Sequence, residues 1–141
     1  MTVYADTSVL VSLYVWDSHT LAARELMKPK PRVHMTPFHL AEFFHAVAKQ
    51  VFQGRISLDQ AEAAYADLKR DLAAGTWLET SVPESAFATC ADLGRRYGPK
   101  LGIRTLDSLH VACALELKAE RFWTFDERQA KLAKAQGMKI S

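Results

Sequence analysis

The chain has 141 residues, of which 49% are hydrophobic and 24% charged, and its formal net charge is +2 at pH 7. This length suits one domain with a sizeable core, and no repeat, low-complexity segment or linker interrupts it, so we expect a single domain over residues 1–141. The net charge is too small to indicate a nucleic-acid partner by itself.

The first strand is predicted at Val3 to Ala5, a short apolar run typical of a buried strand. Helices are predicted over residues 7–15, 18–28 and 37–52, with a second strand at "RVHMT" before the last of them. Ser18 is the expected N-cap of the second helix.

Four further elements follow Gly54. Ser57 and Gln60 form a capping box, and the helix that it opens keeps its apolar period to Leu72. "TWLET" is the predicted third strand. Pro83 is expected at the first position of the next helix, and Gly98-Pro99 at its end. Residues 106–117 are apolar almost all round, which predicts a buried helix.

The chain closes with a fourth strand at "RFWTF", a helix over residues 126–135 and a last strand at "MKI". Strands that alternate with helices predict an α/β domain, with a central, mainly parallel sheet of about four to five short strands between two helix layers. Ligands bind such sheets outside the carboxyl ends of the strands. Asp6 and Asp126 directly follow predicted strands, so both should lie on that rim.

The cellular compartment is predicted from the cysteines and the N-terminal region. Cys90 and Cys113 lie in apolar helical patterns, and we interpret them as buried thiols of a reducing compartment. The apolar stretch from Val9 to Trp16 is too short to span a membrane and lacks the flanks of a signal peptide. We therefore expect a cytoplasmic protein without a membrane partner.

Three acids stand out by position, and each has a purely structural alternative. Asp6 can cap the helix that follows it, and Asp126 with Gln129 resembles a capping box. Asp107 lies in the first turn of the predicted buried helix, where the helix dipole favours an anion. If its carboxylate is buried there, it needs a cation or several donors.

Glu42 is ambiguous by pattern, because it lies opposite an apolar stripe of its helix and periodicity favours an exposed position. His39, Glu42 and His45 are spaced by three residues, so a histidine–carboxylate metal site is an alternative, although the motif matches no zinc-enzyme pattern. His110, one turn after Asp107, is expected to make hydrogen bonds in the core or beside the site.

Four stretches carry a family resemblance: "YADTSVL", "TPFHLAEFFHAV", "TLDSLHVACAL" and "FWTFDERQAKLAKAQGMKI". In this order and over the whole chain, they resemble the PIN-domain family of metal-dependent ribonucleases, in particular the VapC toxins of toxin–antitoxin pairs. The resemblance implies a PIN-like three-layer α/β/α fold. It also implies a type II toxin that hydrolyses RNA phosphodiester bonds in the cytoplasm.

The resemblance assigns roles by position. Asp6, Glu42 and Asp107 match the three core acids of the family, and Asp126 matches a more variable fourth. Thr7 or Ser8, and Thr124, match hydroxyl groups that hydrogen-bond around the site. Clustered carboxylates are suitable ligands for Mg²⁺ or Mn²⁺, which can activate a water for hydrolysis.

The partners expected are RNA, an antitoxin and a second copy of the chain. Arg95, Arg96, Lys100 and Arg104 flank the turn before Asp107, as a phosphate-steering rim or a solvated face. The surplus apolar surface of residues 37–52 suggests a homodimer. The resemblance implies the dimer too, and an antitoxin segment that reaches the acidic pocket. Trp16 could stack on a base, but we expect it in the core.

Two other functions remain open at this point. One is a metal-dependent phosphohydrolase of a small molecule, whose common pattern places a second Asp where this chain has Ser8. The other is a non-catalytic binding domain in which the acids only cap helices and form salt bridges.

Overall fold

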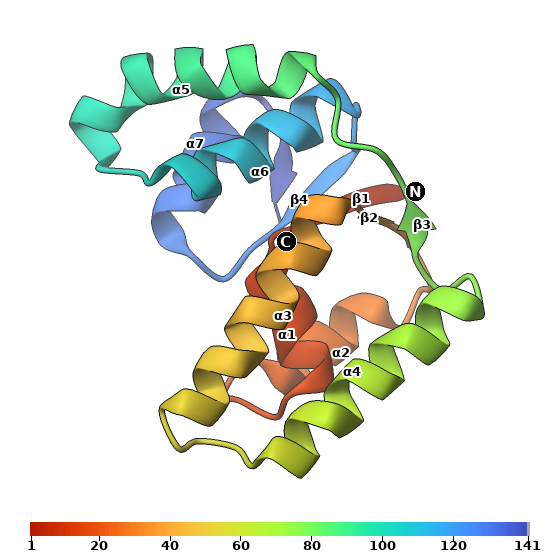
Figure 1. The fold of residues 1–141 in the computed structure, drawn as a ribbon. Helices are drawn as coiled ribbons and strands as arrows, with labels where there is room; N and C mark the ends of the chain where they lie inside the picture. The colour runs from red at the N-terminus through yellow and green to blue at the C-terminus, as the bar shows by residue number, and fades with distance from the viewer. Residues whose placement is uncertain (141) are drawn as a thin grey trace.

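A computed structural model describes residues 1–140 of the chain. Within these residues, five parallel strands form one sheet in the order β3-β2-β1-β4-β5 (Figure 1). Their bounds are β1 (Thr2–Ala5), β2 (Arg32–Met35), β3 (Leu78–Glu79), β4 (Arg121–Trp123) and β5 (Lys139–Ile140). The predicted α/β class with a parallel sheet of short strands is confirmed.

The helices cover both faces of this sheet. Helices α1 to α4 lie on one face and α5 to α7 on the other, so the chain has three layers (Figure 1). Their bounds are α1 (Thr7–Tyr14), α2 (Thr20–Met27), α3 (Pro37–Phe52), α4 (Leu58–Ala73), α5 (Ser85–Leu101), α6 (Thr105–Glu116) and α7 (Glu127–Ala135).

The alternation of side chains along β1 divides the core in two. Val3 and Ala5 pack in the cluster of α1 to α4, whereas Tyr4 between them packs in the cluster of α5 to α7. All three are fully buried, as a central strand between two helix layers requires. Tyr4 thereby places a hydroxyl group inside a core that the sequence pattern describes as wholly apolar.

The start of α2 differs from the prediction. Ser18 is not its N-cap, because the helix begins at Thr20 after His19, which makes no capping hydrogen bond. The turn is held by Asp17 instead, whose backbone N–H donates to the Thr20 hydroxyl at 2.9 Å and whose carboxylate accepts from the His19 N–H at 2.8 Å.

The bounds of α5 differ from the prediction at both ends. Pro83 precedes the helix by two residues and accepts a backbone hydrogen bond from Ala86 at 3.0 Å. The helix also continues through Pro99 to Leu101, because a proline in the last turn removes few helical hydrogen bonds. It ends at Gly102, which adopts the left-handed conformation (φ 60°) that commonly terminates helices.

Two large side chains predicted inside the core lie at the surface. Trp16 is 67% exposed in the loop after α1, under the guanidinium of Arg24, and Leu106 is 51% exposed in the first turn of α6. The remainder of α6 is buried from Ser108 to Ala114, as predicted. Other local predictions are confirmed: Ser57 and Gln60 form a capping box, and the two cysteines are free and buried.

None of the helices in residues 1–140 is long and apolar enough to cross a membrane.

Candidate active site

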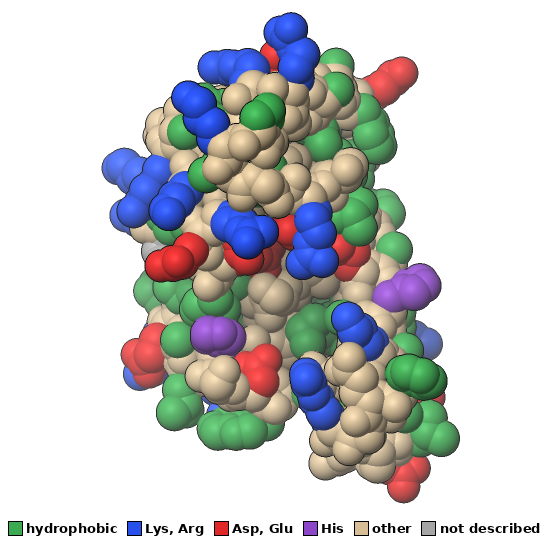
Figure 2. Space-filling view, turned by 90° about the vertical axis from the view of Figure 1, so that its left-hand side faces the viewer, with side chains coloured by type: hydrophobic (Ala, Val, Ile, Leu, Met, Phe, Trp, Pro, Cys, Tyr) green, Lys and Arg blue, Asp and Glu red, His purple; other side chains and the backbone are tan. Residues whose placement is uncertain are grey.

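A pocket of about 480 Å³ lies at the carboxyl ends of β1 and β4, between the two helix layers. All four acids singled out in the sequence line it. Figure 2 shows acidic side chains in a hollow of the surface with Lys and Arg side chains around it. The pocket brings together eight predicted site residues: Asp6, Thr7, Ser8, Glu42, Arg104, Asp107, His110 and Asp126.

Asp6 is both a helix cap and a pocket residue. Its side chain accepts a hydrogen bond from the Val9 N–H at 3.2 Å and one from the Ser8 hydroxyl, at the start of α1. Its second carboxylate oxygen accepts from the Thr124 hydroxyl at 2.7 Å. Thr124 therefore supports the site from behind without lining the pocket. The carboxylate is 6% exposed and rigidly held at the end of β1.

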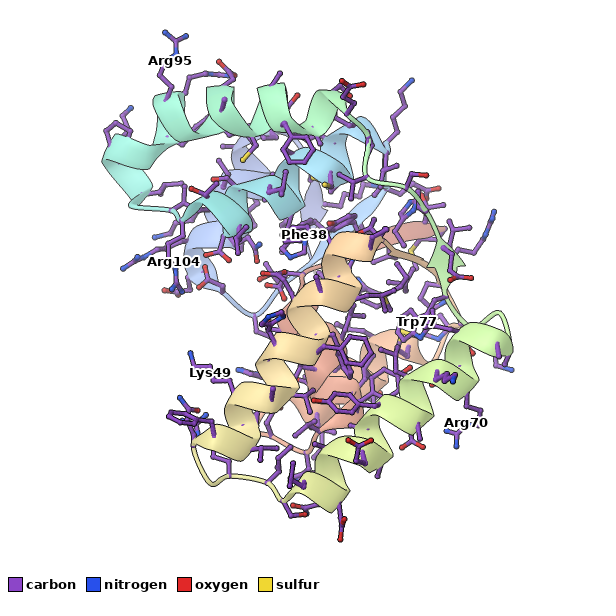
Figure 3. All side chains as sticks on the ribbon, viewed as in Figure 1. Phe38, Lys49, Arg70, Trp77, Arg95 and Arg104 are labelled. Carbon is purple, nitrogen blue, oxygen red and sulfur yellow. The ribbon has the colours of Figure 1, made fainter. Side chains whose placement is uncertain are left out.

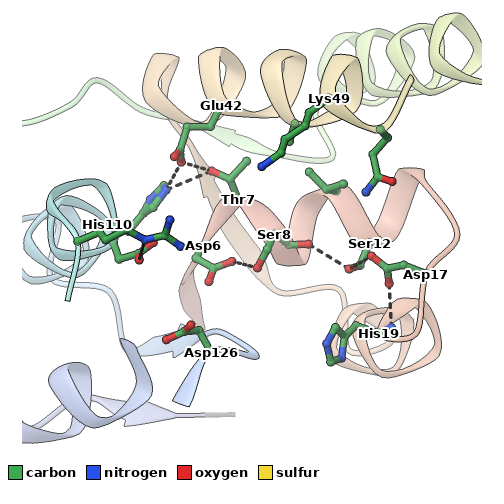
Figure 4. A pocket seen from close by; sticks show the side chains of 15 residues that line it. Asp6, Thr7, Ser8, Ser12, Asp17, His19, Glu42, Lys49, His110 and Asp126 are labelled. Carbon is green, nitrogen blue, oxygen red and sulfur yellow. Dashed lines mark hydrogen bonds and ion pairs between the residues drawn. The ribbon is translucent and has the colours of Figure 1, made fainter. Parts of the chain in front are cut away.

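Asp126 has the same double placement at the end of β4. It is the N-cap of α7, where its side chain accepts from the Gln129 N–H at 2.8 Å, and it is exposed on the pocket wall. Both strand-end acids therefore serve as caps. This does not exclude a second role, because each keeps oxygen atoms at the pocket (Figure 4).

Asp107 differs from the expected buried carboxylate. Its side chain is 38% exposed, and Arg104 lies 3.7 Å away on the same helix turn. Partial burial raises the pKa of Asp107, Arg104 opposes this, and the negative charges of Asp126 and Asp6 raise it further. The pocket acids are thus close enough to repel one another electrostatically.

Glu42 lies in the polar gap between the layers, not on the open face that periodicity favoured. Its side chain is 26% exposed and accepts hydrogen bonds from the Thr7 hydroxyl at 2.7 Å and from His110 (Figure 4). Burial alone would raise the pKa of Glu42. The hydrogen bond and charge of His110, with the hydrogen bond from Thr7, outweigh burial and lower the pKa below its ordinary value.

Tyr4 extends this contact into the core. The Nε2 of His110 faces the Glu42 carboxylate, which can only accept, so Nε2 carries a proton. The other ring nitrogen, Nδ1, forms a hydrogen bond with the Tyr4 hydroxyl at 2.8 Å. Tyr4, His110 and Glu42 therefore form one chain of hydrogen bonds. The sequence analysis missed Tyr4, because a tyrosine in an apolar strand carries no local signal of this contact.

The alternative metal site at His39, Glu42 and His45 is wrong. The Nε2–H of His39 donates to the Ala5 carbonyl at 2.8 Å, and its Nδ1 accepts from the Thr36 N–H at 3.0 Å. Burial, with the nearby charge of His110, lowers the pKa of His39 to about 3, so this ring is a neutral structural group. His45 is exposed and bonds to the Ala41 carbonyl of its own helix.

The four residues of the predicted basic rim do not all lie at the pocket. Arg104 lines the pocket, whereas Arg95 and Arg96 pair with Asp92 on the outer side of α5. In Figure 3, Arg95 points away from the body of the molecule, while Arg104 and Lys49 both lie on the left-hand side of the view. Lys100 is exposed and does not line the pocket.

Lys49 lines the pocket and was missed in the sequence. The spacing of residues along α3 could have indicated its position. Glu42, Ala46 and Lys49 stand at positions i, i+4 and i+7 of α3, which places them on one face of the helix, and all three line the pocket.

The donor set fits a hard divalent cation, because carboxylate oxygens are the ligands that Mg²⁺ and Mn²⁺ prefer. The mutual repulsion that raises the pKa of Asp107 is the kind that a cation relieves. As they stand, no three His, Cys, Asp or Glu side chains of residues 1–140 form a group that could hold a metal ion.

Comparisons with known proteins give one family match and several similar folds. The family model described as the PIN domain matches residues 3–135. The solved structure of Mycobacterium tuberculosis VapC20, a sarcin-ricin loop cleaving toxin, is similar with a TM-score of 0.70 and 18% identity, over 92% of this chain and 93% of that chain. No curated protein sequence matches the chain.

Two further solved structures have similar folds. FitAcB from Neisseria gonorrhoeae has a TM-score of 0.67 and 18% identity, over 98% of this chain and 95% of that chain. VapBC2 from Rickettsia felis, solved with a DNA fragment from its promoter, has a TM-score of 0.66 and 16% identity, over 100% of this chain and 98% of that chain.

Proposed function

The chain belongs to the PIN domain family, and from this we propose that it is a metal-dependent endoribonuclease, the toxin component of a type II toxin–antitoxin pair. The observation that carries the proposal is the gathering of Asp6, Glu42, Asp107 and Asp126 in one pocket at the carboxyl ends of the strands. These acids come from four separate parts of the chain, and helix capping explains only two of them.

In the proposed reaction, Asp6, Glu42, Asp107 and Asp126 hold Mg²⁺ or Mn²⁺. The bound cation supplies charge stabilisation at the scissile phosphate and a water that is more easily deprotonated. The protein holds the ligands in place. Thr7 and His110 orient Glu42, and Ser8 and Thr124 orient Asp6. Arg104 offers a phosphate contact beside Asp107.

The partners belong to the same proposal. The similar structures FitAcB and VapBC2 support a cognate antitoxin. We propose that a segment of the antitoxin reaches the acidic pocket and that an Arg side chain there replaces the cation. We also propose a homodimer that forms through α3, where Phe44 is 44% exposed and Phe52 is 92% exposed.

The test is cleavage of total cellular RNA by the purified protein, with mapping of the new ends, in the presence of Mg²⁺, Mn²⁺ or EDTA. We expect metal-dependent cleavage. Asp6→Asn and Asp107→Asn should each reduce it by at least about 100-fold, the loss expected when one group that stabilises transition-state charge is removed.

Two controls separate the other functions. A phosphomonoester such as p-nitrophenyl phosphate should not be hydrolysed, and its hydrolysis without RNA cleavage would identify a small-molecule phosphohydrolase. Protein that binds RNA or the antitoxin but cleaves nothing with either metal would identify a binding domain. Lys69→Ala, an exposed substitution on α4 away from the pocket, should cleave like the wild type.

A further inference from the structure

We propose that the pocket contains a second subsite, which binds one unpaired nucleotide of the RNA beside the acids and is formed by Lys49 and by His19, whose ring is stacked on Phe125. This inference rests on the proposed function for its ligand class. The pocket extends beyond the acids along α1, to a part lined by Ser12, Asp17, His19 and Lys49 (Figure 4). Neither the helix caps nor the acidic site uses this part of the pocket.

The first component is a stacked ring pair. The imidazole of His19 and the ring of Phe125 lie 4.4 Å apart between centroids with an interplanar angle of 7°. His19 is exposed and Phe125 is partly exposed. The pair joins the turn before α2 to the end of β4, directly beside Asp126. Unpaired bases stack on aromatic surfaces of this kind.

Asp17 fixes the position of His19. Its two carboxylate oxygens accept from the Ser12 hydroxyl and from the His19 N–H, both at 2.8 Å. The carboxylate is therefore used within the turn, and its role is to hold the His19 backbone. The ring is thus presented by an ordered turn, which lowers the entropy that a nucleotide would lose by ordering it.

The second component is Lys49. It is exposed on α3, and no acid of residues 1–140 forms an ion pair with it. It lines the pocket two helical turns from Glu42. A pocket of four acids repels an RNA backbone, so a strand that crosses it needs cations on either side. Arg104 stands beside Asp107, and Lys49 projects from α3 into the same pocket (Figure 4).

Together these groups match an unpaired nucleotide: rings for its base and an ammonium group for its phosphate. A duplex would present its phosphates to Lys49 but would keep its bases stacked inside the helix, out of reach of His19. The subsite therefore selects single-stranded RNA next to the scissile bond.

The test measures binding apart from cleavage. The parent protein is Asp6→Asn in Mg²⁺, and the probe is a fluorescein-labelled single-stranded RNA of mixed sequence, about 12 nucleotides long, within the range of site sizes known for single-strand-binding OB folds. Fluorescence anisotropy at several salt concentrations gives the Kd and its salt slope. His19→Ala and Lys49→Ala are added to the parent, with Phe87→Ala and Lys134→Ala as controls at an exposed aromatic ring and an exposed lysine outside the pocket.

We expect His19→Ala to weaken binding about 5-fold or more with an unchanged salt slope, as for the loss of one base stack. His19→Trp should restore it. Lys49→Ala should weaken binding and reduce the salt slope by about one unit. The controls should bind like the parent. A duplex of the same sequence should not respond to His19→Ala.

Parent-like binding by both pocket variants, an equal loss in the controls, or no RNA binding by the parent would overturn the subsite. A thermal melt of each variant checks folding, and His19→Trp keeps the test decisive if His19→Ala loosens the turn. The two proposals can fail separately. If the wild type cleaves RNA but His19→Ala and Lys49→Ala leave RNA binding unchanged, only the subsite is overturned. If the two substitutions weaken RNA binding but the wild type shows no metal-dependent cleavage, only the nuclease function is overturned.

Discussion

Asp6 and Asp126 combine two roles that are often treated as alternatives. Each carboxylate accepts a hydrogen bond from a backbone N–H at a helix start, and each lines the acidic pocket. A strand end followed directly by a helix is a rigid attachment point, so a capping acid there is already oriented for a ligand. Substitution by Asn separates the roles, because Asn caps about as well as Asp but has no charge.

For Asp126→Asn we expect a change in the free energy of unfolding of no more than about 0.5 kcal/mol. RNA cleavage should fall, but less than in Asp6→Asn or Asp107→Asn, since Asp126 is the most exposed of the three acids. The measurements are cleavage rate against Mn²⁺ concentration and a thermal melt for all three variants. Wild-type cleavage by Asp126→Asn at every concentration would leave Asp126 as a cap only.

Tyr4→Phe tests the hydrogen-bond chain behind Glu42. The substitution removes the hydroxyl that hydrogen-bonds to His110 Nδ1 and leaves this buried ring nitrogen without its partner. We expect a loss of about 1–3 kcal/mol in the free energy of unfolding, measured with urea. Tyr65→Phe on α4, where the ring packs against Phe44, is the matched control and should cost less. Equal costs for the two variants would contradict a stabilising role of the hydrogen bond between Tyr4 and His110.

Helix α3 connects the sheet to the pocket through residues on different faces. Glu42 and Lys49 line the pocket, Phe43 and Val47 pack in the core, and His39 holds the end of β1 through the Ala5 carbonyl. The helix starts with a capping box in which the Thr36 hydroxyl and the His39 ring exchange hydrogen bonds with backbone N–H groups. These contacts fix the position of α3 at its first turn, close to Glu42.

The buried His39 predicts a pH dependence of stability. Its pKa is lowered to about 3 in the folded chain, so between roughly pH 6.5 and 3 the unfolded chain binds a proton that the folded chain does not. Stability should thus fall as the pH is lowered through this window, by up to about 1.4 kcal/mol per pH unit from this group. Urea unfolding of the wild type and of His39→Gln at about pH 7, 6, 5 and 4, which covers most of this window, is the measurement that checks this expectation.

His39→Gln should be less stable at neutral pH, because the hydrogen bonds of the imidazole are changed, but its stability should depend less on pH. An identical slope in the two proteins would assign the pH dependence to other groups, such as Glu42, whose lowered pKa makes its contribution to stability decline as the pH falls below its ordinary pKa.

The structure around the turn between α5 and α6 predicts that the four basic residues contribute unequally to RNA binding. Neutralising Arg95, Arg96, Lys100 and Arg104 together should weaken RNA binding and reduce its salt dependence. Of the four, only Arg104 lines the pocket, so Arg104→Ala should produce most of the effect and reduce the salt slope by about one unit. Arg95→Ala is the control. A larger effect for Arg95→Ala than for Arg104→Ala would move the RNA path onto the outer side of α5.

The whole molecule presents its acidic pocket and its apolar groove on separate surfaces. The groove, about 530 Å³, lies between α3 and α4 and is lined by Leu40, Phe44, Tyr65 and Leu72 among others. Exposed apolar surface of this kind commonly marks an interface. Because the groove shares no lining residue with the acidic pocket, dimer formation and cleavage can be altered independently.

We expect light scattering to detect a homodimer at micromolar concentration and Phe44→Asp to shift it toward the monomer. A charge placed in an apolar interface is costly unless it is paired. The same substitution at exposed Phe52, at the end of α3, tests whether the whole helix or only the groove takes part. A wild-type protein that stays monomeric at this concentration would contradict the dimer.

Local patterns were sufficient for the class of fold, the order of the elements and the caps at Asp6 and Asp126. Each of these depends on residues within one or two turns of each other, as in the capping contact of Asp126 with Gln129. Local patterns failed where two neighbouring residues could each end or start a helix. Ser18 was the predicted N-cap of α2, but Asp17 holds that turn, and α5 ends at Gly102 instead of at Gly98-Pro99.

The surroundings of Glu42 were decided only by tertiary structure. Its partners Thr7 and His110 lie 35 and 68 residues away along the chain, and Tyr4 lies 106 residues from His110. Periodicity describes which face of a helix is apolar, but it cannot tell whether a polar face meets water or another polar group. That depends on how α3 packs across the end of the sheet against α1 and α6, and this packing turns Glu42 from a surface acid into a pocket residue.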